Sequence, residues 1–299
     1  MASISRRWTL SCEDEGFPAS LKDLSEPPEL IHGIGSAEAL SGPCISIIGA
    51  RRATPYGLAV AEMAARVAVE CGITVVSGGA MGCDHAAGLA AIRHGGKTVI
   101  VSGCGADVIY PASSGDLYEG AVATGGAVIS TEQWGRGPRR WSFPRRNRLI
   151  AALSLATVVT EAGIASGTMS TAEAAAELDR ILYAIPGSIF SPGSSGTNRL
   201  IAEGARVIPD EQSLGMSIAL DYGVARLSST GHRRSGGPLM SALVASPSRP
   251  DELSERTNED VLTVMRTLTD YEARGLVERL PDGRYAPTRF YYLGHNDGS

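Results

Sequence analysis

A stretch of arginines interleaved with aromatic residues is the part of the sequence whose chemistry is easiest to define. Six arginines and no acidic residue lie between Arg136 and Arg148, and Trp134, Trp141 and Phe143 lie beside or among them. Guanidinium groups bind phosphates, and aromatic rings stack on unpaired bases for about 1–3 kcal/mol per base. The mixture favours single-stranded nucleic acid over an ordinary solvated surface. The candidate contacts here are Arg140, Phe143, Arg146, Asn147 and Arg148.

Glycine-rich loops form a second group of candidates, because main-chain N–H groups at the start of a helix attract anions. In "GARRATPYG" an arginine stands just beyond the glycine that ends a strand, and it adds a bidentate phosphate donor. The loops "SGGAMGCD" and "TEAGIASGTMS" also lie between a strand and a helix. Asn198, in a later loop, is either a helix N-cap or a contact. The candidates are Arg51, Ser77, Gly78, Gly79, Gly167, Thr168 and Asn198.

The second of these loops resembles a dinucleotide-binding fingerprint, but the sequence predicts no nicotinamide or flavin cofactor. An acidic residue is expected about 20 residues further on, at the end of the next strand. That strand ends in Val101, Ser102 and Gly103 instead. Asp84 and His85 are expected to be a helix N-cap and a hydrogen-bonded histidine.

Catalysis and metal binding are not predicted. Glu161 could act as a general base, but no second titratable group stands at the spacing that a paired acid and base need. The five cysteines are far apart and never form a CxxC or CxH pair, so we expect reduced thiols and no metal. Cys83 and Cys104 lie in glycine-rich loops, where a reactive thiol is conceivable, but no motif supplies a base.

Length and composition indicate a folded protein with a local basic surface. The 299 residues are 43 % hydrophobic, enough for a full core. The net charge of −5 means that any contact with nucleic acid is confined to a small region. Because no apolar run approaches the roughly 18 residues of a membrane span, and no signal-like segment opens the chain, we expect a cytoplasmic protein without a membrane contact.

From Cys44 onward, buried strands, glycine-rich loops and helices alternate, which is typical of a parallel sheet. Strands such as Thr98–Val101 and Thr157–Val159 are apolar at nearly every position, so helices should cover both faces of the sheet. The carboxyl ends of the strands would form one ligand-binding edge. Helices are expected near 56–72, from about 83, and at 115–124, 143–153, 168–178 and 194–204.

The remaining segments suggest four parts in the chain. Residues 1–43, in which Pro18, Pro27 and Pro28 break any long helix, are expected to be an irregular brace, followed by the sheet domain at 44–210. Residues 211–238, rich in Ser and Gly near their end, are expected to be a linker. Residues 239–299 predict a small winged-helix-like domain, with a hairpin around Pro281 to Gly283 and a helix whose inward residues are Val261, Val264, Met265 and Leu268.

Six strings, in this order, resemble the DprA (also called Smf) family of DNA-processing proteins. They are "GARRATPYG", "VVSGGAMGCDHAAGLAAIRHGGKTVIVSGCGADVIYP", "GAVIST", "FPRRNRLIAALS", "TEAGIASGTMSTAEAA" and "AIPGSIFSPGSSGTNRLIAEGA". The resemblance covers roughly residues 17–209. It implies an extended Rossmann-like fold, a homodimer, binding of single-stranded DNA, and loading of the recombinase RecA during natural transformation or recombination, with no enzymatic activity.

The resemblance also assigns roles to individual residues. Arg51 matches the arginine of the first loop that contacts DNA phosphate, and Arg140 matches the basic residue three positions before the aromatic Phe143. Asn147 matches the asparagine of the RNR motif. Ala50 departs from the family, which usually has serine there, so a hydroxyl that could help bind phosphate is missing.

Two other functions fit the same fold. Nucleotide phosphoribohydrolases of the LOG type carry a catalytic glutamate in a PGGxGTxxE string, where this chain has Thr171 in "GIASGTMST". A nucleotide-sensing regulator would instead bind a small ligand in the loops and report it to duplex DNA through the tail. The acidic balance of the tail makes insertion into a DNA groove less favourable and indicates a protein-facing role.

Overall fold

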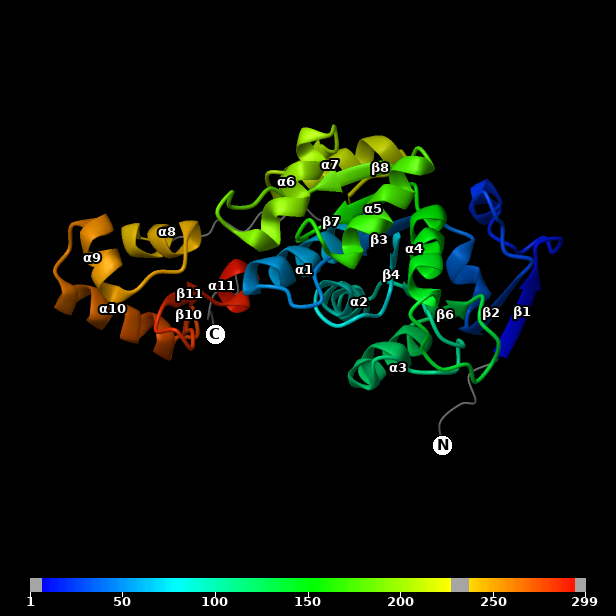
Figure 1. Cartoon of the computed structure of the whole chain (residues 1–299), viewed down its shortest axis with the longest axis horizontal. Helices are drawn as coiled ribbons and strands as arrows, with labels where there is room; N and C mark the ends of the chain where they lie inside the picture. Colours follow the sequence, from blue (N-terminus) through cyan, green and yellow to red (C-terminus); the bar gives the residue numbers. More distant parts are fainter. Residues whose placement is uncertain (1–6, 227–236, 294–299) are drawn as a thin grey trace. The chain divides into compact units, whose positions relative to one another are not determined.

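The computed structural model describes residues 7–226 and 237–293 and contains a nine-stranded sheet (Figure 1). The strand order is β1-β2-β6-β5-β4-β3-β7-β8-β9, and neighbours from β6 to β9 are parallel. The strands are β1 (Arg7–Ser11), β2 (Leu30–Gly35), β3 (Cys44–Ile48), β4 (Thr74–Ser77), β5 (Thr98–Val101), β6 (Ala127–Ser130), β7 (Ala156–Val159), β8 (Ile181–Ala184) and β9 (Arg206–Val207).

Helices cover both faces of this sheet, which confirms the predicted Rossmann-like fold. Every residue of β3, β4, β5, β6 and β7 is buried, as expected for strands covered on both sides. Helices α1 to α3 lie on one face, and α4 and α5 on the other (Figure 1). The helices are α1 (Pro55–Glu70), α2 (Cys83–Arg93), α3 (Gly115–Ala123), α4 (Ser142–Leu153), α5 (Gly167–Glu177) and α6 (Ser195–Ala202).

The direction of the sheet reverses between β3 and β7. From β3 the chain moves outward through β4, β5 and β6, then returns to place β7 on the other side of β3. Right-handed crossovers explain why the helices change face at this point. In open α/β sheets the loops diverge at such a reversal and leave a crevice at the carboxyl ends of the strands.

The prediction of irregular structure before Ile45 is wrong. Strand β2 pairs antiparallel with β6, with His32 opposite Ser130, and β1 pairs antiparallel with β2. The three prolines lie between these strands rather than inside them. These strands are only partly buried, so they lack the continuous apolar pattern that predicts the parallel strands.

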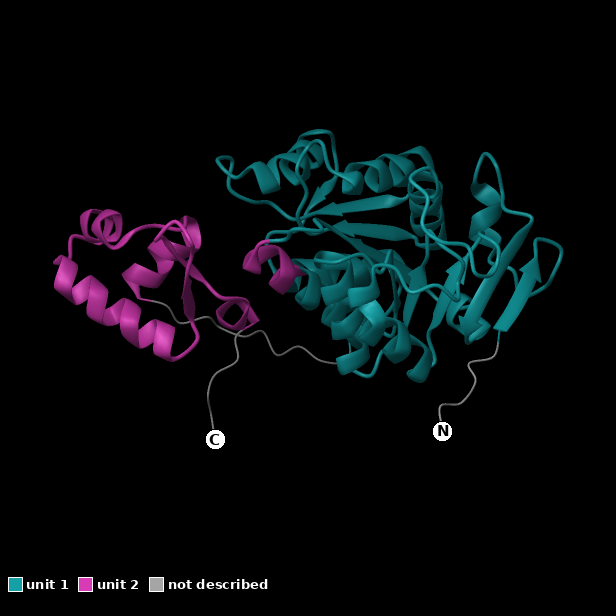
Figure 2. Ribbon diagram, turned by 60° about the horizontal axis from the view of Figure 1, so that its bottom comes forward, with its two compact units in different colours: residues 1–53, 61–229 teal, residues 54–60, 230–299 magenta. Residues whose placement is uncertain are grey.

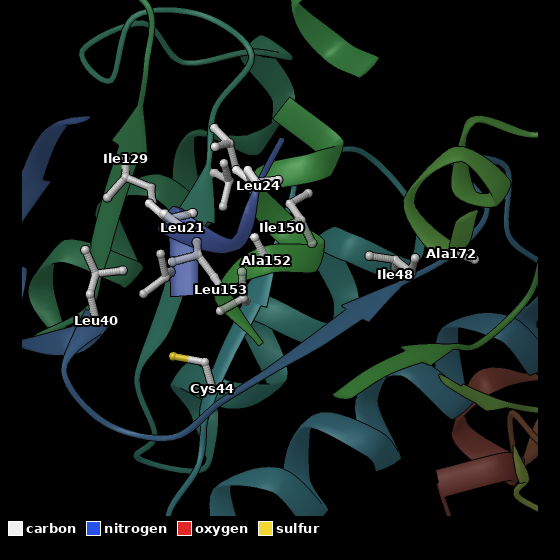
Figure 3. Close-up of a cluster of buried hydrophobic side chains, with 14 of the residues drawn as sticks. Leu21, Leu24, Leu40, Cys44, Ile48, Ile129, Ile150, Ala152, Leu153 and Ala172 are labelled. Atoms are coloured by element: carbon white, nitrogen blue, oxygen red, sulfur yellow. The ribbon is translucent and has the colours of Figure 1, made fainter. Parts of the chain in front are cut away.

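The N-terminal segment contributes to the main core. A short 3₁₀ helix, η1 (Ala19–Asp23), packs against α4, and a second one, η2 (Ala37–Leu40), precedes β3. Leu21 and Leu24 join Ile150 and Leu153 of α4 in one buried cluster that also includes Ile129 of β6 (Figure 3). Burying side chains of this size contributes roughly 1.5–3 kcal/mol each, so this packing fixes the position of α4.

The first part of the predicted linker is a helix. Helix α7 (Glu211–Tyr222) begins at Asp210, whose carboxylate accepts a hydrogen bond from the backbone N–H of Ser213 at 2.7 Å. The Tyr222 hydroxyl donates to the carbonyl of Cys44 at 2.8 Å and accepts from the N–H of Ala156 at 3.1 Å. Residues 227–236 of the predicted linker lie outside the described residues.

Arginine and glutamate side chains also hold α7. Arg226 lies 2.6 Å from Glu70 of α1 and 2.6 Å from Glu211, and Arg66 of α1 also pairs with Glu211 at 2.6 Å. This helix buries few apolar side chains: Leu214 and Ile218 are the ones that are fully buried. Its attachment therefore depends on polar contacts that hydrophobic periodicity does not reveal.

Contacts divide the chain into two compact units, residues 1–53 with 61–229 and residues 54–60 with 230–299 (Figure 2). The second unit has three helices followed by a hairpin, which confirms the winged-helix prediction. Its elements are α8 (Pro238–Ala245), α9 (Pro250–Thr257), α10 (Val261–Ala273), β10 (Val277–Arg279), β11 (Tyr285–Pro287) and α11 (Arg289–Leu293). Across residues 7–226 and 237–293, no helix is both long and apolar enough to cross a bilayer.

The prediction of which α10 residues face inward is correct for two of the four residues. Val264 and Leu268 are fully buried, whereas Val261 is 46 % exposed and Met265 is 40 % exposed. The buried pair is spaced i, i+4 and forms one row on the helix. The exposed pair has the same spacing on the neighbouring row, so the small domain buries one row and leaves the other in solvent.

Replacing Tyr222 by phenylalanine should destabilise the first unit. The change leaves the N–H of Ala156 without its partner and removes one of the two donors to the carbonyl of Cys44, which keeps the N–H of Leu155 at 3.3 Å, at a cost of about 1–3 kcal/mol. Urea denaturation followed by circular dichroism measures this loss. Leu220→Ala, on the same helix and 78 % exposed, is the matched control and should change stability by less than about 0.5 kcal/mol. Equal stability of the two variants would contradict this role for Tyr222.

Candidate nucleic-acid interface

A pocket lies where the sheet reverses, at the carboxyl ends of β3 and β7. Its volume is about 590 Å³, and the predicted residues Arg51, Arg146, Asn147, Gly167 and Thr168 all line it. A smaller pocket next to it is lined by Arg51, Gly78, Phe143 and Arg146. The structure therefore brings the first glycine loop, the loop before α5 and the start of α4 to one place.

Arg146 is a buried cation behind these pockets. Its side chain is 5 % exposed, and Nη1 donates to the carbonyls of Gly78 at 2.6 Å and Val101 at 2.9 Å. Arg146 thus joins α4 to the carboxyl ends of β4 and β5. The prediction that it contacts nucleic acid is untested, but these bonds give it a positioning role.

Asp84 carries the opposite charge on the other side of Gly78. Its carboxylate accepts the N–H of Gly78 at 2.9 Å and is also hydrogen-bonded by the backbone of Gly49. A Cβ on Gly78 would lie 2.0 Å from Nη1 of Arg146 and 2.7 Å from Oδ2 of Asp84, so glycine is required there. We call Asp84, Gly78 and Arg146 the Gly78 clamp; it fixes the ends of β3, β4 and β5.

Burial and charge act against each other in this clamp. Burial raises the pKa of the Asp84 carboxyl, and the charge of Arg146 and the N–H groups of Gly78 and Gly49 oppose that rise. Burial likewise lowers the pKa of the Arg146 guanidinium, and the charge of Asp84 opposes it. Each charge is therefore stabilised by the other, and neither is available as a free surface charge.

Arg51 and Phe143 form the exposed part of the site. The guanidinium of Arg51 lies 5.8 Å from the centre of the Phe143 ring, and that of Arg146 lies at the same distance, 5.8 Å. Phe143 is half-buried, and Arg51 is exposed. Arg140 is exposed in the turn that leads into α4, three residues before Phe143. An unpaired base could stack where the ring is open, beside a cation able to hold its phosphate.

The second glycine loop supports the site from behind. Ser77 is fully buried, and its hydroxyl lies 3.5 Å from the carbonyl of Asp84. Gly79 has a φ of +64°, and a Cβ there would lie 2.7 Å from Ile100. Of the three residues predicted in this loop, Gly78 lines a pocket, whereas Ser77 and Gly79 shape the turn.

The start of α5 is fastened to its neighbours by side chains. Asn147 donates to the carbonyl of Gly167 at 3.3 Å and to the hydroxyl of Ser170 at 2.8 Å. Thr168 donates to the carbonyl of Gly49 at 2.9 Å. These bonds hold the N–H groups at the first turn of α5 toward the pocket, where they can attract an anion.

Arg148 and Asn198, like Arg140, Ser77 and Gly79, are predicted contacts that do not line either pocket. Arg148 is 3.7 Å from Glu177 of α5 and is half-exposed. Asn198 lies inside α6, and its amide accepts from and donates to the backbone of Gly187, at 3.1 and 3.0 Å. The N-cap alternative for Asn198 is wrong, since Ser194 is the N-cap.

Ion pairing separates the remaining arginines into two groups. Arg136 pairs with Glu132 at 3.2 Å, which reduces its availability. Five other arginines at this edge of the sheet are exposed and form no ion pair with any described residue. They are Arg51, Arg52, Arg139, Arg140 and Arg145. Without an ion-pair partner among the described residues, these cations are suited to an external phosphate.

Sequence reasoning missed Asp84 as the counter-charge to Arg146. Asp84 was expected to be a helix N-cap, but the N-cap of α2 is Gly82 and Asp84 is the second residue of the helix. The signal was present, because an acidic residue next to a glycine loop in a nearly all-apolar helix needs a buried partner. The expected hydrogen bond of His85 is confirmed, at 3.0 Å from Asp116.

Burial sets the state of most of the cysteines. All five are free thiols, and all except Cys12 are buried. Burial raises the pKa of the Cys83 thiol to about 12, so this group is a neutral thiol at ordinary pH. Within the described ranges, no group of three His, Cys, Asp or Glu side chains is arranged to hold a metal.

Comparison with known families identifies similar proteins. Residues 8–218 match the family described as "DNA recombination-mediator protein A", and residues 234–283 match the "DprA winged helix domain". The "DNA processing protein DprA" of Streptococcus pneumoniae is 35 % identical over 206 residues, which is 69 % of this chain and 72 % of that protein. "Protein Smf" of Escherichia coli is 28 % identical over 285 residues, which is 92 % of this chain and 76 % of that protein.

Solved structures show the same fold. The structure of DprA from Streptococcus pneumoniae matches with a TM-score of 0.65 at 35 % identity, covering 69 % of this chain and 72 % of that one. A Helicobacter pylori structure, described as giving insight into the "unique single-stranded DNA binding mode of DNA processing protein A", matches with a TM-score of 0.66 at 32 % identity. It covers 74 % of this chain and 99 % of that one.

Removing Arg146 should destabilise the protein more than removing a surface arginine. Arg146→Leu leaves the charge of Asp84 uncompensated and two carbonyls unbonded, at a cost of about 3–5 kcal/mol. Arg148→Leu, on the same helix, should cost less than about 1 kcal/mol. Urea denaturation of Arg146→Leu, Asp84→Asn and the double variant forms a cycle. The double variant should be more stable than the sum of the single losses predicts, whereas strict additivity would contradict the clamp.

The cysteines should differ in reactivity. In the folded protein at about pH 8, iodoacetamide should modify Cys12 first and Cys44 and Cys83 slowest, because the thiolate is the nucleophile and burial raises the pKa of both thiols to about 12. Mass spectrometry of the digested protein measures the order, and unfolding in guanidinium should make all five reactive. Rapid modification of Cys83 in the folded state would show that the thiol is neither buried nor protonated.

Proposed function

This chain belongs to the DNA recombination-mediator protein A family, and from that premise we propose that it binds single-stranded DNA along the carboxyl edge of its sheet. The Arg51 loop, Arg140 and the N-terminal turn of α5 would hold phosphates, and Phe143 would stack on a base. The Helicobacter pylori relative, similar over 99 % of its length, is described by its single-stranded DNA binding mode, which supports the proposal.

One observation carries this proposal: Arg51 is exposed beside the Phe143 ring and forms no ion pair with any described residue, whereas the buried Arg146 is compensated by the charge of Asp84. The distance of 5.8 Å between guanidinium and ring centre permits a cation–π contact, and this contact orients both groups. The Gly78 clamp stabilises Arg146 internally, so the charge left to attract a polyanion is that of the exposed arginines. Focused positive charge of this kind explains how a chain of net charge −5 binds DNA.

The same geometry favours a single strand over a duplex. Trp141 is 52 % exposed, with the Arg139 guanidinium 6.0 Å from its ring, and Phe143 follows it on α4. Exposed rings gain stacking energy when bases are unpaired, while paired bases keep their faces covered. Among the described residues that line the 590 Å³ pocket, the acidic side chain is Asp84, which the clamp already engages. Binding rather than catalysis is therefore the function that we assign.

The wider role follows from family membership. We infer that the protein works as a homodimer in the cytoplasm, protects incoming single strands and loads the RecA recombinase on them during natural transformation or recombination. Family membership, shown by the match over residues 8–218, supports this role. A strand-exchange assay with RecA, in the presence of a single-strand binding competitor, tests the loading step. If the protein does not stimulate strand exchange, RecA loading is not part of its function.

Substitution of the rim arginines tests DNA binding directly. Arg51→Ala and Arg140→Ala should each weaken binding of a labelled single-stranded oligonucleotide by about 1–3 kcal/mol, because each removes a charge-assisted hydrogen bond. Fluorescence anisotropy at several salt concentrations should show the log–log slope falling by about 0.7 per lost phosphate contact. Lys97→Ala is the matched control, since Lys97 is exposed just before β5, at the opposite edge of the sheet.

The control and a duplex of the same sequence decide the result. Lys97→Ala should bind like the unaltered protein, and the duplex should bind more weakly than the single strand. If Arg51→Ala, Arg140→Ala and Lys97→Ala lose affinity equally, positive charge anywhere on the protein attracts DNA equally well, and the proposed site is wrong. If the duplex binds as well as the single strand, base stacking at Phe143 has no part in recognition.

A further inference from the structure

A second pocket lies at the same edge of the sheet, beyond β5. Its volume is about 690 Å³, and its lining includes His32, Gln133, Trp134 and Arg145, with Pro27–Leu30 of the N-terminal segment and Thr131. Strand β6 is parallel to β5, and β2 runs antiparallel to β6. The end of β6 and the start of β2 therefore meet at the edge that carries Arg51.

The first turns of α4 border both pockets. Phe143 and Arg146 line the pocket that contains Arg51, whereas Arg145 lines the second one. Consecutive residues on a helix point about 100° apart, so Arg145 and Arg146 face different directions from the same turn. A strand that passes along this turn would leave one pocket and enter the other.

The aromatic wall of the second pocket is held in place before any ligand arrives. The rings of Trp134 and His32 lie 5.2 Å apart at 48°, and the Arg7 guanidinium lies 4.8 Å from the centre of the indole. Nδ1 of His32 is hydrogen-bonded to the Thr9 hydroxyl at 2.9 Å. Fixed rings lose little conformational entropy when a base stacks on them, which suits them to nucleotide binding.

Charge at this pocket fits a phosphate at one side. Arg145 is exposed and forms no ion pair with any residue in the described ranges, unlike its neighbours Arg136 and Arg148. Glu29, also exposed in the lining, has the opposite effect and repels an anion. A volume of several hundred Å³ is in the range of small-ligand sites.

We propose that this pocket is a second nucleotide subsite of the same DNA strand, with the base against Trp134 and His32 and the phosphate at Arg145. The subsite rests on the proposed function, because it extends the strand bound at Arg51. It makes the N-terminal strands part of the binding surface. The site would act when the strand is long enough to reach from one pocket to the other.

Oligonucleotide length separates the two subsites experimentally. The full chain is titrated with a short single strand of about 4–6 nucleotides and with one longer than about 16 nucleotides. Arg145→Ala and Trp134→Ala should weaken binding of the long strand about 5- to 10-fold and leave the short strand unchanged. Arg145→Ala should also lower the salt slope for the long strand by about 0.7. Trp134→Phe should restore most of the affinity, and Lys97→Ala should have no effect.

Two further measurements guard against a misfolded variant. Glu29→Gln keeps the side-chain shape and should tighten binding of the long strand, because it removes a repulsive charge. Quenching of tryptophan fluorescence by the long strand should be smaller in Trp134→Phe than in the unaltered protein, which has three tryptophans.

The possible outcomes distinguish this inference from the proposed function. If the short strand binds through Arg51 but none of the substitutions at Arg145, Trp134 or Glu29 alters binding of the long strand, the second subsite is wrong and the proposed function stands. If the unaltered protein binds neither strand, the proposed function fails and the second subsite fails with it.

Discussion

The interface depends on two opposite buried charges that share one glycine. Asp84 binds the N–H of Gly78, and Arg146 binds its carbonyl. Through these bonds, and those to Gly49 and Val101, the ends of three parallel strands are fixed relative to α4. Buried charges are costly unless they are compensated, so this arrangement persists only when both are present. The exposed arginines and Phe143 are placed by a scaffold that does not itself need the ligand.

Much of the sheet could be predicted from sequence because its strands are buried on both faces. Each strand from β3 to β8 appears as a short apolar run before a glycine-rich loop, and this signal does not depend on distant contacts. The antiparallel strands β1 and β2 and helix α7 lack that signal. Their positions are fixed by partners far along the chain, such as Ser130 for His32 and Cys44 for Tyr222.

In the candidate site, too, some features could be predicted from sequence and others could not. Residue types made Arg51, Phe143 and the start of α5 candidates, since charged, aromatic and glycine-rich segments have direct chemical meaning, and the structure places all three at adjoining pockets. Sequence alone could not separate Arg146, which is buried, from Arg145, one position earlier and exposed. That distinction depends on the phase of α4 against the sheet. In the LOG-type alternative a glutamate would stand at Thr171, which lines the pocket here and is buried.

The reversal of strand order has a consequence for how the chain folds as it leaves the ribosome. Strand β3 is central, yet its second neighbour β7 comes after three other strands of the sheet have been synthesised, and the bond from Cys44 of β3 to Tyr222 joins residues 178 positions apart. The half-sheet from β3 to β6 can assemble from nearby segments first. Until β7 emerges, β3 presents an uncovered apolar border with unpaired backbone groups, which is the feature that chaperones recognise and that promotes aggregation. We therefore expect this border to close only after β7 and α7 have emerged.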